Sequence, residues 1–194
     1  MAEVKVLIPG YTTADSKSGG EEKTRATTTL VRDGDIVMVC DPGVLDSRQI
    51  LIDALKKEGL EINDVNYVFI THSHIDHYRN IGMFPNAKTL EFYGIWDGQK
   101  VDDWQENFTD NIKIIKTPGH NYDGLTLLVK TKEGIVAICG DVFWKKDFPK
   151  LVYPDGGGDP YASDPEKLQE SRQKVLELAD WIIPGHAEMY KVEK

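Results

Sequence analysis

Short runs of apolar residues, separated by polar and glycine-bearing segments, recur along most of the chain. Runs of this length, rich in valine, isoleucine and leucine, are typical of β-strands. Two pairs of runs are joined at Asp33-Gly34 and at Glu133-Gly134, where glycine tolerates the positive φ of a tight hairpin turn. The pattern predicts strands at residues 3–8, 26–32, 36–40, 65–71, 88–92, 112–117, 125–131, 134–139 and 181–183.

Two segments carry apolar residues at the spacing of an α-helix instead. Residues 47–58 show this period and are followed by Gly59, which favours the end of a helix. Residues 165–179 show it as well, with Ser163 or Asp164 as the residue that caps the helix. Strands and helices mixed within a chain of this length predict an α/β sandwich made of layers.

Two segments lack an apolar period. Residues 10–24 predict a mobile loop, and residues 143–163 predict a long loop that carries aromatic side chains and lysines. Residues 36–41 and 135–141 echo each other, because each is the end of a predicted hairpin followed by a carboxylate. We therefore expect a single domain over residues 1–194 that is built from two similar halves.

The composition is that of an ordinary globular protein, with 40% hydrophobic and 28% charged residues. The apolar runs are too short to span a bilayer, and the first residues lack the pattern of a signal peptide, so we expect a cytoplasmic protein without a membrane partner. The net charge of −9 argues against nucleic acid as a partner, although a local basic patch would still permit it. Cys40 and Cys139 each end an apolar run and predict buried, reduced thiols.

Three of the five histidines lie in the segment His72-Ser73-His74-Ile75-Asp76-His77, directly after a predicted strand. Residues two apart in an extended segment project to the same side, so His72 and His74 can bind one ion. If a helix begins after Ile75, Asp76 and His77 can point to a second ion beside the first. Imidazole and carboxylate ligands suit zinc, iron or manganese, and a set without cysteine argues against a closed structural zinc site.

The remaining histidines and two further carboxylates also follow predicted strands. His120 and His186 each come after Pro-Gly, and Asp141 comes after Gly140. A lone histidine is usually a surface or packed residue, and Asp141 could be a turn residue, but ligands gathered at strand ends favour an open metal site. Asp41, in Asp-Pro-Gly, is either a turn residue or a carboxylate that bonds a ligand histidine from behind.

These motifs, in this order, resemble those of the metallo-β-lactamase superfamily. The resemblance covers residues 41–186 and implies an αββα fold, in which two mixed β-sheets are flanked by helices. It also implies two Zn²⁺ ions per chain, with Fe or Mn as other possibilities, and a bridging carboxylate. The implied ligands are His72, His74 and His120 for one ion, Asp76, His77 and His186 for the other, and Asp141 between them.

The sequence departs from the motifs of some branches of the superfamily, and these differences argue against the activities of those branches. True β-lactamases with a similar triad carry cysteine or serine at the position of Asp141, so β-lactam hydrolysis is not the expected activity. Flavodiiron proteins carry an acidic residue at the position of His74, which argues against that redox branch. Residues 163–186 are similar to a short subgroup of the superfamily that has been linked to RNA cleavage.

The resemblance and the ligand set together predict a binuclear zinc-dependent hydrolase that uses a metal-bridging hydroxide. The expected substrate is a small ester, thioester or lactone, and Asp76 would orient the hydroxide and carry a proton to the leaving group. One alternative is a phosphodiesterase or ribonuclease with the same ions. Another is a mononuclear iron sulfur dioxygenase that uses His72, His74 and Asp141. The last is a binding module that keeps the fold without catalysis.

The loops after the ligands are where we expect the substrate to bind. Asn121 and Tyr122 follow His120 directly, and Trp144 and Lys145 belong to the long loop after Asp141. The more ordinary role of each is surface packing or solubility. A lysine at the mouth would favour an anionic substrate. The expected partner is thus a small molecule, and a homodimer is possible.

Overall fold

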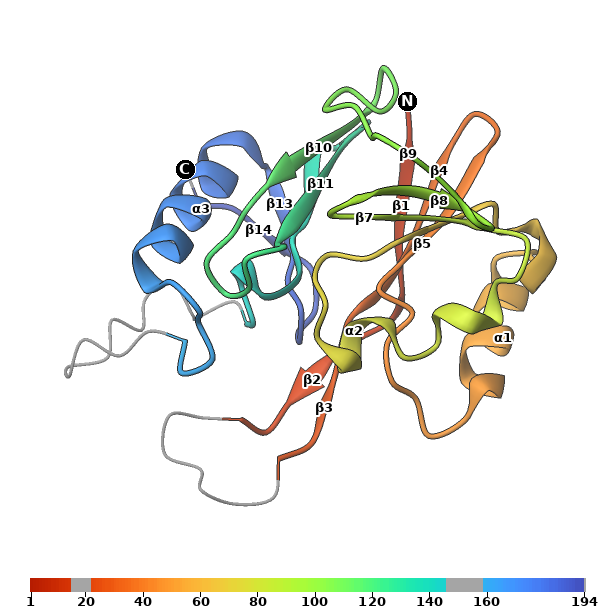
Figure 1. Cartoon of the computed structure of the whole chain (residues 1–194), viewed down its shortest axis with the longest axis horizontal. Coiled ribbons are helices and arrows are strands. Elements are labelled where there is room, and N and C mark those ends of the chain that lie inside the picture. The colour runs from red at the N-terminus through yellow and green to blue at the C-terminus, as the bar shows by residue number, and fades with distance from the viewer. Residues whose placement is uncertain (15–21, 146–158, 194) are drawn as a thin grey trace.

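The computed structural model describes residues 1–14, 22–145 and 159–193 of the chain. Two main β-sheets, shown in Figure 1, form its centre. The larger sheet is mixed: its strands pair antiparallel except where β5, β6 and β7 run parallel. In spatial order its strands are β1 (Glu3–Ile8), β4 (Thr28–Asp33), β5 (Ile36–Cys40), β6 (Tyr67–Phe69), β7 (Lys88–Glu91), β8 (Gly94–Asp97) and β9 (Lys100–Asp102).

The smaller sheet is also mixed, because β12 and β13 pair in parallel while the other neighbours are antiparallel. Its strands are β10 (Ile112–Lys116), β11 (Leu125–Thr131), β12 (Gly134–Ile138), β13 (Trp181–Ile183) and β14 (Tyr190–Lys191). A separate short hairpin pairs β2 (Tyr11–Thr12) with β3 (Thr24–Arg25). The expected pair of mixed sheets is confirmed.

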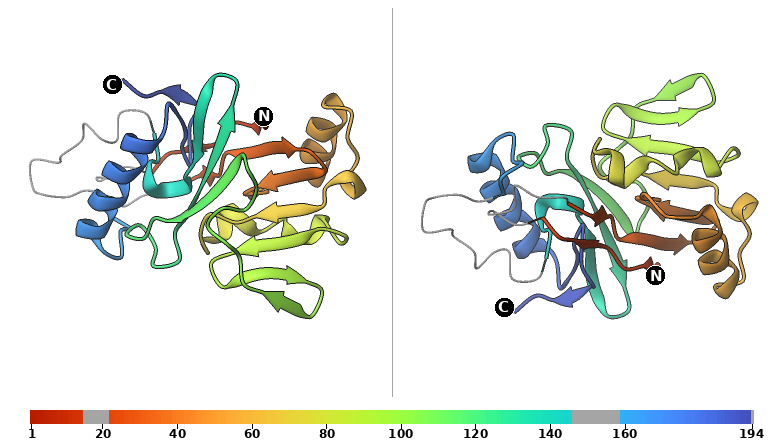
Figure 2. Two further views of the ribbon diagram at one scale, coloured as in Figure 1. Left: turned by 90° about the horizontal axis from the view of Figure 1, so that it is seen from above. Right: turned by 90° about the horizontal axis from the view of Figure 1, so that it is seen from below.

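Each sheet buries one face against the other sheet and the opposite face against a helix. On β5, Met38 packs between the sheets, and its neighbour Val39 packs on the outer face. The outer face of the larger sheet contacts Leu51 and Leu55 of α1 (Arg48–Lys57). The smaller sheet is covered in the same way by α3 (Pro165–Leu178), through residues such as Val175. Figure 2 shows the resulting order of layers, helix–sheet–sheet–helix.

The main helices and turns form where the sequence predicts them. Ser47 caps α1 by accepting a hydrogen bond from the Gln49 amide at 3.2 Å. Asp164 caps α3 by accepting one from the Lys167 amide at 3.1 Å, in agreement with its predicted role. The hairpin turn between β4 and β5 contains Gly34 at φ 58°, a conformation that glycine adopts without strain.

Two expectations about buried and membrane-spanning segments can be compared with the structure. Cys40 and Cys139 are buried, unpaired thiols, as expected, and burial raises the pKa of both. Within the described residues, no helix is both long and apolar enough to cross a bilayer.

Several elements differ from the sequence prediction. The predicted loop over residues 10–24 contains the β2–β3 hairpin, while residues 15–21 of that loop lie outside the described part of the chain. Strands β8, β9 and β14 were not predicted, because they are short and largely polar or exposed, as β9 is throughout. Of the predicted loop 143–163, residues 146–158 also lie outside the described residues.

Candidate metal centre

Four loops that follow strands converge on one cluster of histidines and carboxylates. The short helix α2 (Ile75–Tyr78) begins directly after His74, as the predicted second ion position requires. The sequence-predicted ligands are brought together from separate elements. They are His72, His74, Asp76 and His77 after β6, His120 after β10, Asp141 after β12 and His186 after β13.

The two Pro-Gly-His segments owe their glycines to close packing. A Cβ atom on Gly185 would overlap Oδ1 of Asp141. Gly119 has φ 133°, and a Cβ atom there would overlap the backbone of Leu168 on α3. In both segments the absent side chain lets the loop approach its neighbour closely enough to direct the following imidazole into the cluster.

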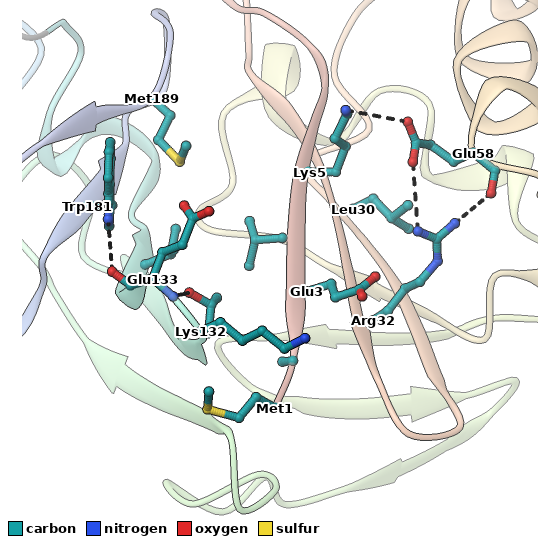
Figure 3. Close-up of a pocket in the computed structure, with 14 residues that line it drawn as sticks. Met1, Glu3, Lys5, Leu30, Arg32, Glu58, Lys132, Glu133, Trp181 and Met189 are labelled. Carbon is teal, nitrogen blue, oxygen red and sulfur yellow. Dashed lines mark hydrogen bonds and ion pairs between the residues drawn. The ribbon is translucent and has the colours of Figure 1, made fainter.

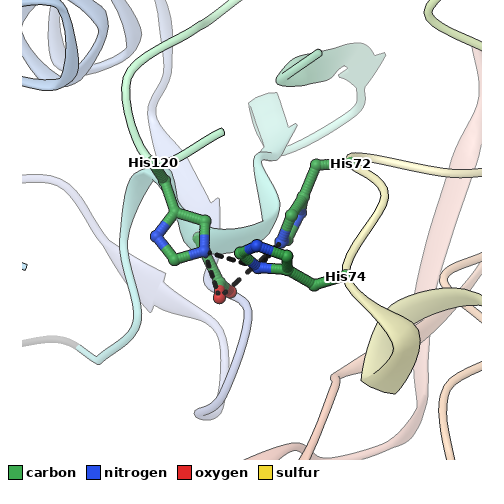
Figure 4. A group of neighbouring side chains, drawn as sticks. His72, His74 and His120 are labelled. Carbon is green, nitrogen blue, oxygen red and sulfur yellow. Dashed lines mark hydrogen bonds and ion pairs between the residues drawn. The ribbon is translucent and has the colours of Figure 1, made fainter. Parts of the chain in front are cut away.

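One group of donor atoms is formed by three histidines, shown in Figure 4, and one carboxylate. His74 Nδ1 lies 3.0 Å from His72 Nε2 and 2.9 Å from His120 Nε2. His120 Nε2 also lies 3.3 Å from Oδ2 of Asp141. These atoms all fall within 4.8 Å of one another, which is the spacing of ligands around a single cation.

A second group lies on the other side of Asp141. His77 Nε2 is 3.3 Å and His186 Nε2 is 3.2 Å from Oδ1 of Asp141. His186 Nε2 is also 3.6 Å from Oδ2 of Asp76. His186 Nε2 lies equally close, at 3.2 Å, to Oδ2 of Asp141. The Asp141 carboxylate therefore contacts histidines of both groups, as a carboxylate shared by two cations would.

The unsatisfied atoms of the cluster fit a bound cation. His77 Nε2 and Asp141 Oδ1 are buried, and neither has a hydrogen-bond partner among the described residues. Buried polar atoms without a partner are rare because their desolvation is not compensated. Bound divalent cations would satisfy both atoms, and the two donor groups offer a place for one ion each, so the residues present fit a two-ion site.

The rings of His77 and His72 are held from behind by hydrogen-bond acceptors. His77 Nδ1 donates to Asp41 at 2.8 Å, which is the contact expected if Asp41 supports a ligand. His72 Nδ1 lies 3.1 Å from the Thr71 hydroxyl, which itself donates to Asp41 at 2.7 Å. Because the Nδ1 proton is used in these bonds, the Nε2 lone pairs of His77 and His72 point into the cluster.

Burial and like charge favour neutral imidazoles in the first group. Burial, aided by the neighbouring His77, holds the pKa of His72 well below its usual range. Burial, aided by His120, also lowers the pKa of His74. Neutral imidazole is the form that binds metal, so these two rings need not lose a proton near neutral pH.

In the second group, neighbouring carboxylates favour charged imidazoles instead. Burial opposes a charge on His77, but the carboxylates of Asp141 and Asp41 outweigh it and raise its pKa well above the usual value. Burial likewise opposes a charge on His186, and Asp141 outweighs it and raises that pKa. Burial disfavours the Asp141 carboxylate, yet the surrounding imidazoles prevail and hold its pKa well below the usual range.

Comparison with known proteins agrees with this geometry. Residues 23–101 match the sequence model of the metallo-beta-lactamase superfamily. Metallo-beta-lactamase domain-containing protein 1 of Xenopus laevis is 33% identical, over 98% of this chain and 82% of that protein. The chain belongs to the metallo-β-lactamase superfamily. The chain spans only 59% of the human protein of that name, with 30% identity over 80% of the chain.

Other members of the superfamily support the fold and the general chemistry. A probable metallo-hydrolase of Methanocaldococcus jannaschii is 31% identical over 81% of this chain and 74% of that protein. The structure of a metallo-beta-lactamase-like protein from Thermotoga maritima has a TM-score of 0.74 at 22% identity, covering 98% of this chain and 99% of that one. An N-acyl homoserine lactone hydrolase has a TM-score of 0.69 at 15% identity, covering 95% and 92%. Family and donor set assign the chain to the metal-dependent hydrolases of the metallo-β-lactamase fold.

The β2–β3 hairpin, which the sequence did not predict, forms one wall of the site. The Thr24 hydroxyl donates to Oδ2 of Asp76 at 3.1 Å and lies 3.2 Å from His186 Nδ1. The backbone oxygen of Arg25 accepts a bond from the same nitrogen at 3.0 Å. These contacts join residues that lie more than 50 positions apart, so no local pattern indicates them.

An aromatic pair forms the opposite wall. Trp144 stacks on Tyr161 with ring centroids 5.5 Å apart, and its edge faces the rings of His120 and His186. The Tyr161 hydroxyl donates to the carboxylate of Glu22 at 2.6 Å. Between the walls lies a cavity of about 280 Å³ that opens onto the cluster of histidines and carboxylates. Outside the ligand set, this cavity is lined by Thr12, Ala14, Glu22, Thr24, Ile75, Trp144 and Tyr161.

Of the four predicted substrate residues, Trp144 alone lines this cavity. The side-chain amide of Asn121 donates to the Ser73 hydroxyl at 3.4 Å. Tyr122 is 59% exposed, and its hydroxyl lies 3.2 Å from that of Tyr93. Lys145 is half-buried next to Trp144. Contact of any of them with substrate stays a prediction.

A second hollow, shown in Figure 3, lies between β1 and β13. Its volume is about 310 Å³, and its lining contains none of the seven predicted metal ligands. Two of its cations, Lys5 and Arg32, pair with Glu58 at 3.9 and 3.8 Å. The histidine cluster therefore lies outside this hollow.

Proposed function

We propose that the chain is a dizinc hydrolase of small neutral acyl compounds, namely esters, thioesters or lactones. The observation that carries the proposal is the place of the Asp141 carboxylate between the two groups, 3.3 Å from His120 Nε2 on one side and 3.3 and 3.2 Å from His77 and His186 Nε2 on the other. When bound, two divalent cations at such a site supply a hydroxide nucleophile at neutral pH and polarise the substrate oxygen. Donors of nitrogen and oxygen, with three imidazoles in one group, favour zinc.

The protein's own residues would hold the ions, position the acyl group and move a proton. Asp76 is the carboxylate of the second group that reaches the cavity, with its side chain 15% exposed. Its Oδ2 is held by the Thr24 hydroxyl, which fixes its direction at the cavity wall. A carboxylate in this place can accept a proton and deliver it to a leaving alkoxide or thiolate.

The walls of the cavity support a neutral substrate. Trp144, Tyr161 and Ile75 offer apolar surface, while Glu22 and Asp76 give the lining a negative charge. Among the described lining residues there is no lysine or arginine that would attract a phosphate. The lactone hydrolase of similar fold carries its hydrolysed product at its catalytic metal centre, which makes lactones a first choice to assay.

The test combines metal content with a substrate panel. We expect about two zinc ions per chain in protein purified without chelator, and hydrolysis of ester, thioester or lactone probes. Asp141→Asn should lower both, while Asp46→Asn, at an exposed position, should lower neither. One iron per chain with oxygen uptake, or cleavage of phosphodiesters alone, would replace this proposal with the corresponding alternative. A protein that takes up no metal would refute it.

A further inference from the structure

A buried carboxylate that the sequence analysis did not single out stands behind one metal ligand. Asp159 bonds Nδ1 of His120, and its side chain is 0% exposed. Asp159 lies in the segment that leads into α3, and 39 positions of sequence separate it from His120. The contact gives His120 a charged acceptor behind its ring, as Asp41 does for His77.

The surrounding bonds hold Asp159 in place. Its second oxygen, Oδ1, accepts the Tyr161 amide at 2.9 Å, and its backbone oxygen accepts the Ala162 amide at 3.1 Å. The same segment is tied to the histidine loop from the other direction. The Ser163 amide donates to the backbone oxygen of His120 at 3.0 Å, so backbone and side chain of His120 are both fixed by this segment.

We propose that Asp159 is a positioning residue that acts on one metal position only, through His120. Its bond to Nδ1–H selects the ring form in which Nε2 is the free donor, and the carboxylate makes that donor more basic. Asp41 differs, because it bonds both His77 and the Thr71 hydroxyl behind His72, and so touches a ligand in each group. The inference rests on the proposed two-ion site.

The position of Asp159 also links this metal position to the substrate cavity. The oxygen that does not face His120 is bound by the amide of Tyr161, whose ring stacks on Trp144. One short segment thus carries both the support of a metal ligand and an aromatic wall residue. Loss of the carboxylate is expected to disturb the ligand first, because the wall residues keep their ring contacts.

The experiment measures zinc affinity of the full chain by competition with a chromophoric chelator. We expect Asp159→Ala to lower the affinity for one of the two zinc ions by about 10- to 100-fold and to leave the affinity for the other near the wild-type value. Asp159→Asn should lose less, because its amide oxygen can still accept from His120. Asp164→Asn is the matched control: it makes the same change five positions on, at the exposed cap of α3, and should bind both ions normally.

The outcomes separate this inference from the proposed function. If wild-type protein fails to bind two ions, the two-ion site is wrong. If the wild-type protein binds two zinc ions, and Asp159→Asn and Asp159→Ala bind both ions as tightly as the wild type does, the inference is wrong. Nitrogen-detected NMR of the rings adds a readout that structural damage alone would not give, since only His120 should change its protonated nitrogen. If Asp159→Ala does not fold, the zinc affinities of Asp159→Asn are the test. An equal loss of affinity for both ions in Asp159→Asn would overturn the inference.

Discussion

Replacement of Asp41 is the sharpest test of how the cluster is supported. Its carboxylate is buried and accepts three hydrogen bonds, from the Thr71 amide at 2.9 Å, the Thr71 hydroxyl at 2.7 Å and His77 Nδ1 at 2.8 Å. In Asp41→Ala the hydroxyl can rotate toward another acceptor, but the amide and Nδ1 are left as buried donors. At roughly 1–3 kcal/mol for each buried unsatisfied donor, the free energy of unfolding should fall by roughly 2–6 kcal/mol.

A loss of this size is large for a domain whose total stability is about 5–15 kcal/mol. Asp41 also has φ 46°, a conformation that alanine tolerates less well than asparagine or aspartate. Asp41→Asn is therefore the matched variant, because it keeps an acceptor for Thr71 and suits the same backbone. We expect it to lose clearly less stability than Asp41→Ala.

The assay is urea unfolding of metal-free protein, followed by fluorescence and circular dichroism. With a slope of about 2 kcal/mol per molar urea, the midpoint of Asp41→Ala should fall by about 1–3 M. Asp46→Ala removes an exposed carboxylate and should leave the midpoint within about 0.3 M of wild type. A midpoint for Asp41→Ala that matches wild type would show that these three bonds do not support the cluster.

Three further results are expected. Gly119→Ala should destabilise the fold by roughly 2–6 kcal/mol and weaken metal binding, because its Cβ would overlap the Leu168 backbone at a positive φ. In the control variant Gly82→Ala the new Cβ meets no atom within 4 Å, so its stability should be nearly that of wild type. Thermal melts of both variants measure the difference. Zinc content per chain should be lower at acidic pH than at alkaline pH, because the raised pKa of His77 and His186 keeps the second group protonated as the pH is lowered; metal analysis over a pH series measures it. Equal zinc content at acidic and alkaline pH would contradict this prediction. In metal-free protein the same raised pKa values contribute stability that is fully present below about pH 6.5 and is lost as the pH rises through the raised values. Trp144→Ala should raise KM for an acyl substrate by roughly 3- to 10-fold, since an aromatic contact contributes about 0.5–1.5 kcal/mol, and steady-state kinetics at unchanged zinc content measures it.

The sequence predicts those parts of the protein that depend on neighbours along the chain. Helices α1 and α3 follow from the local spacing of apolar residues, and the cap of α3 is one of the two residues that the sequence offers, Asp164. The strands of the two sheet centres follow from their apolar runs. The segment from His72 to His77 announces a metal site because its ligand types are already adjacent in the sequence.

The partners of those ligands could not be predicted in the same way. Asp159 follows no ligand motif and reaches His120 only because α3 packs against the loop before that histidine. Thr24 and Arg25 lie in a segment without an apolar period, and they meet His186 across more than 160 positions of sequence. Such contacts depend on how the two sheets and their loops come together.

The sequence by itself therefore determined the kinds of donor atoms and the strand ends that carry them, since both are local properties of the chain. The family resemblance implies how the donors divide into two groups, but only the tertiary structure decided the distances within each group and the contacts of Asp141 with histidines of both. It also decided which groups hold each ring from behind and which walls enclose the cavity. The physical reason is that distances and directions between atoms far apart in sequence are fixed only when both sheets pack on their common core.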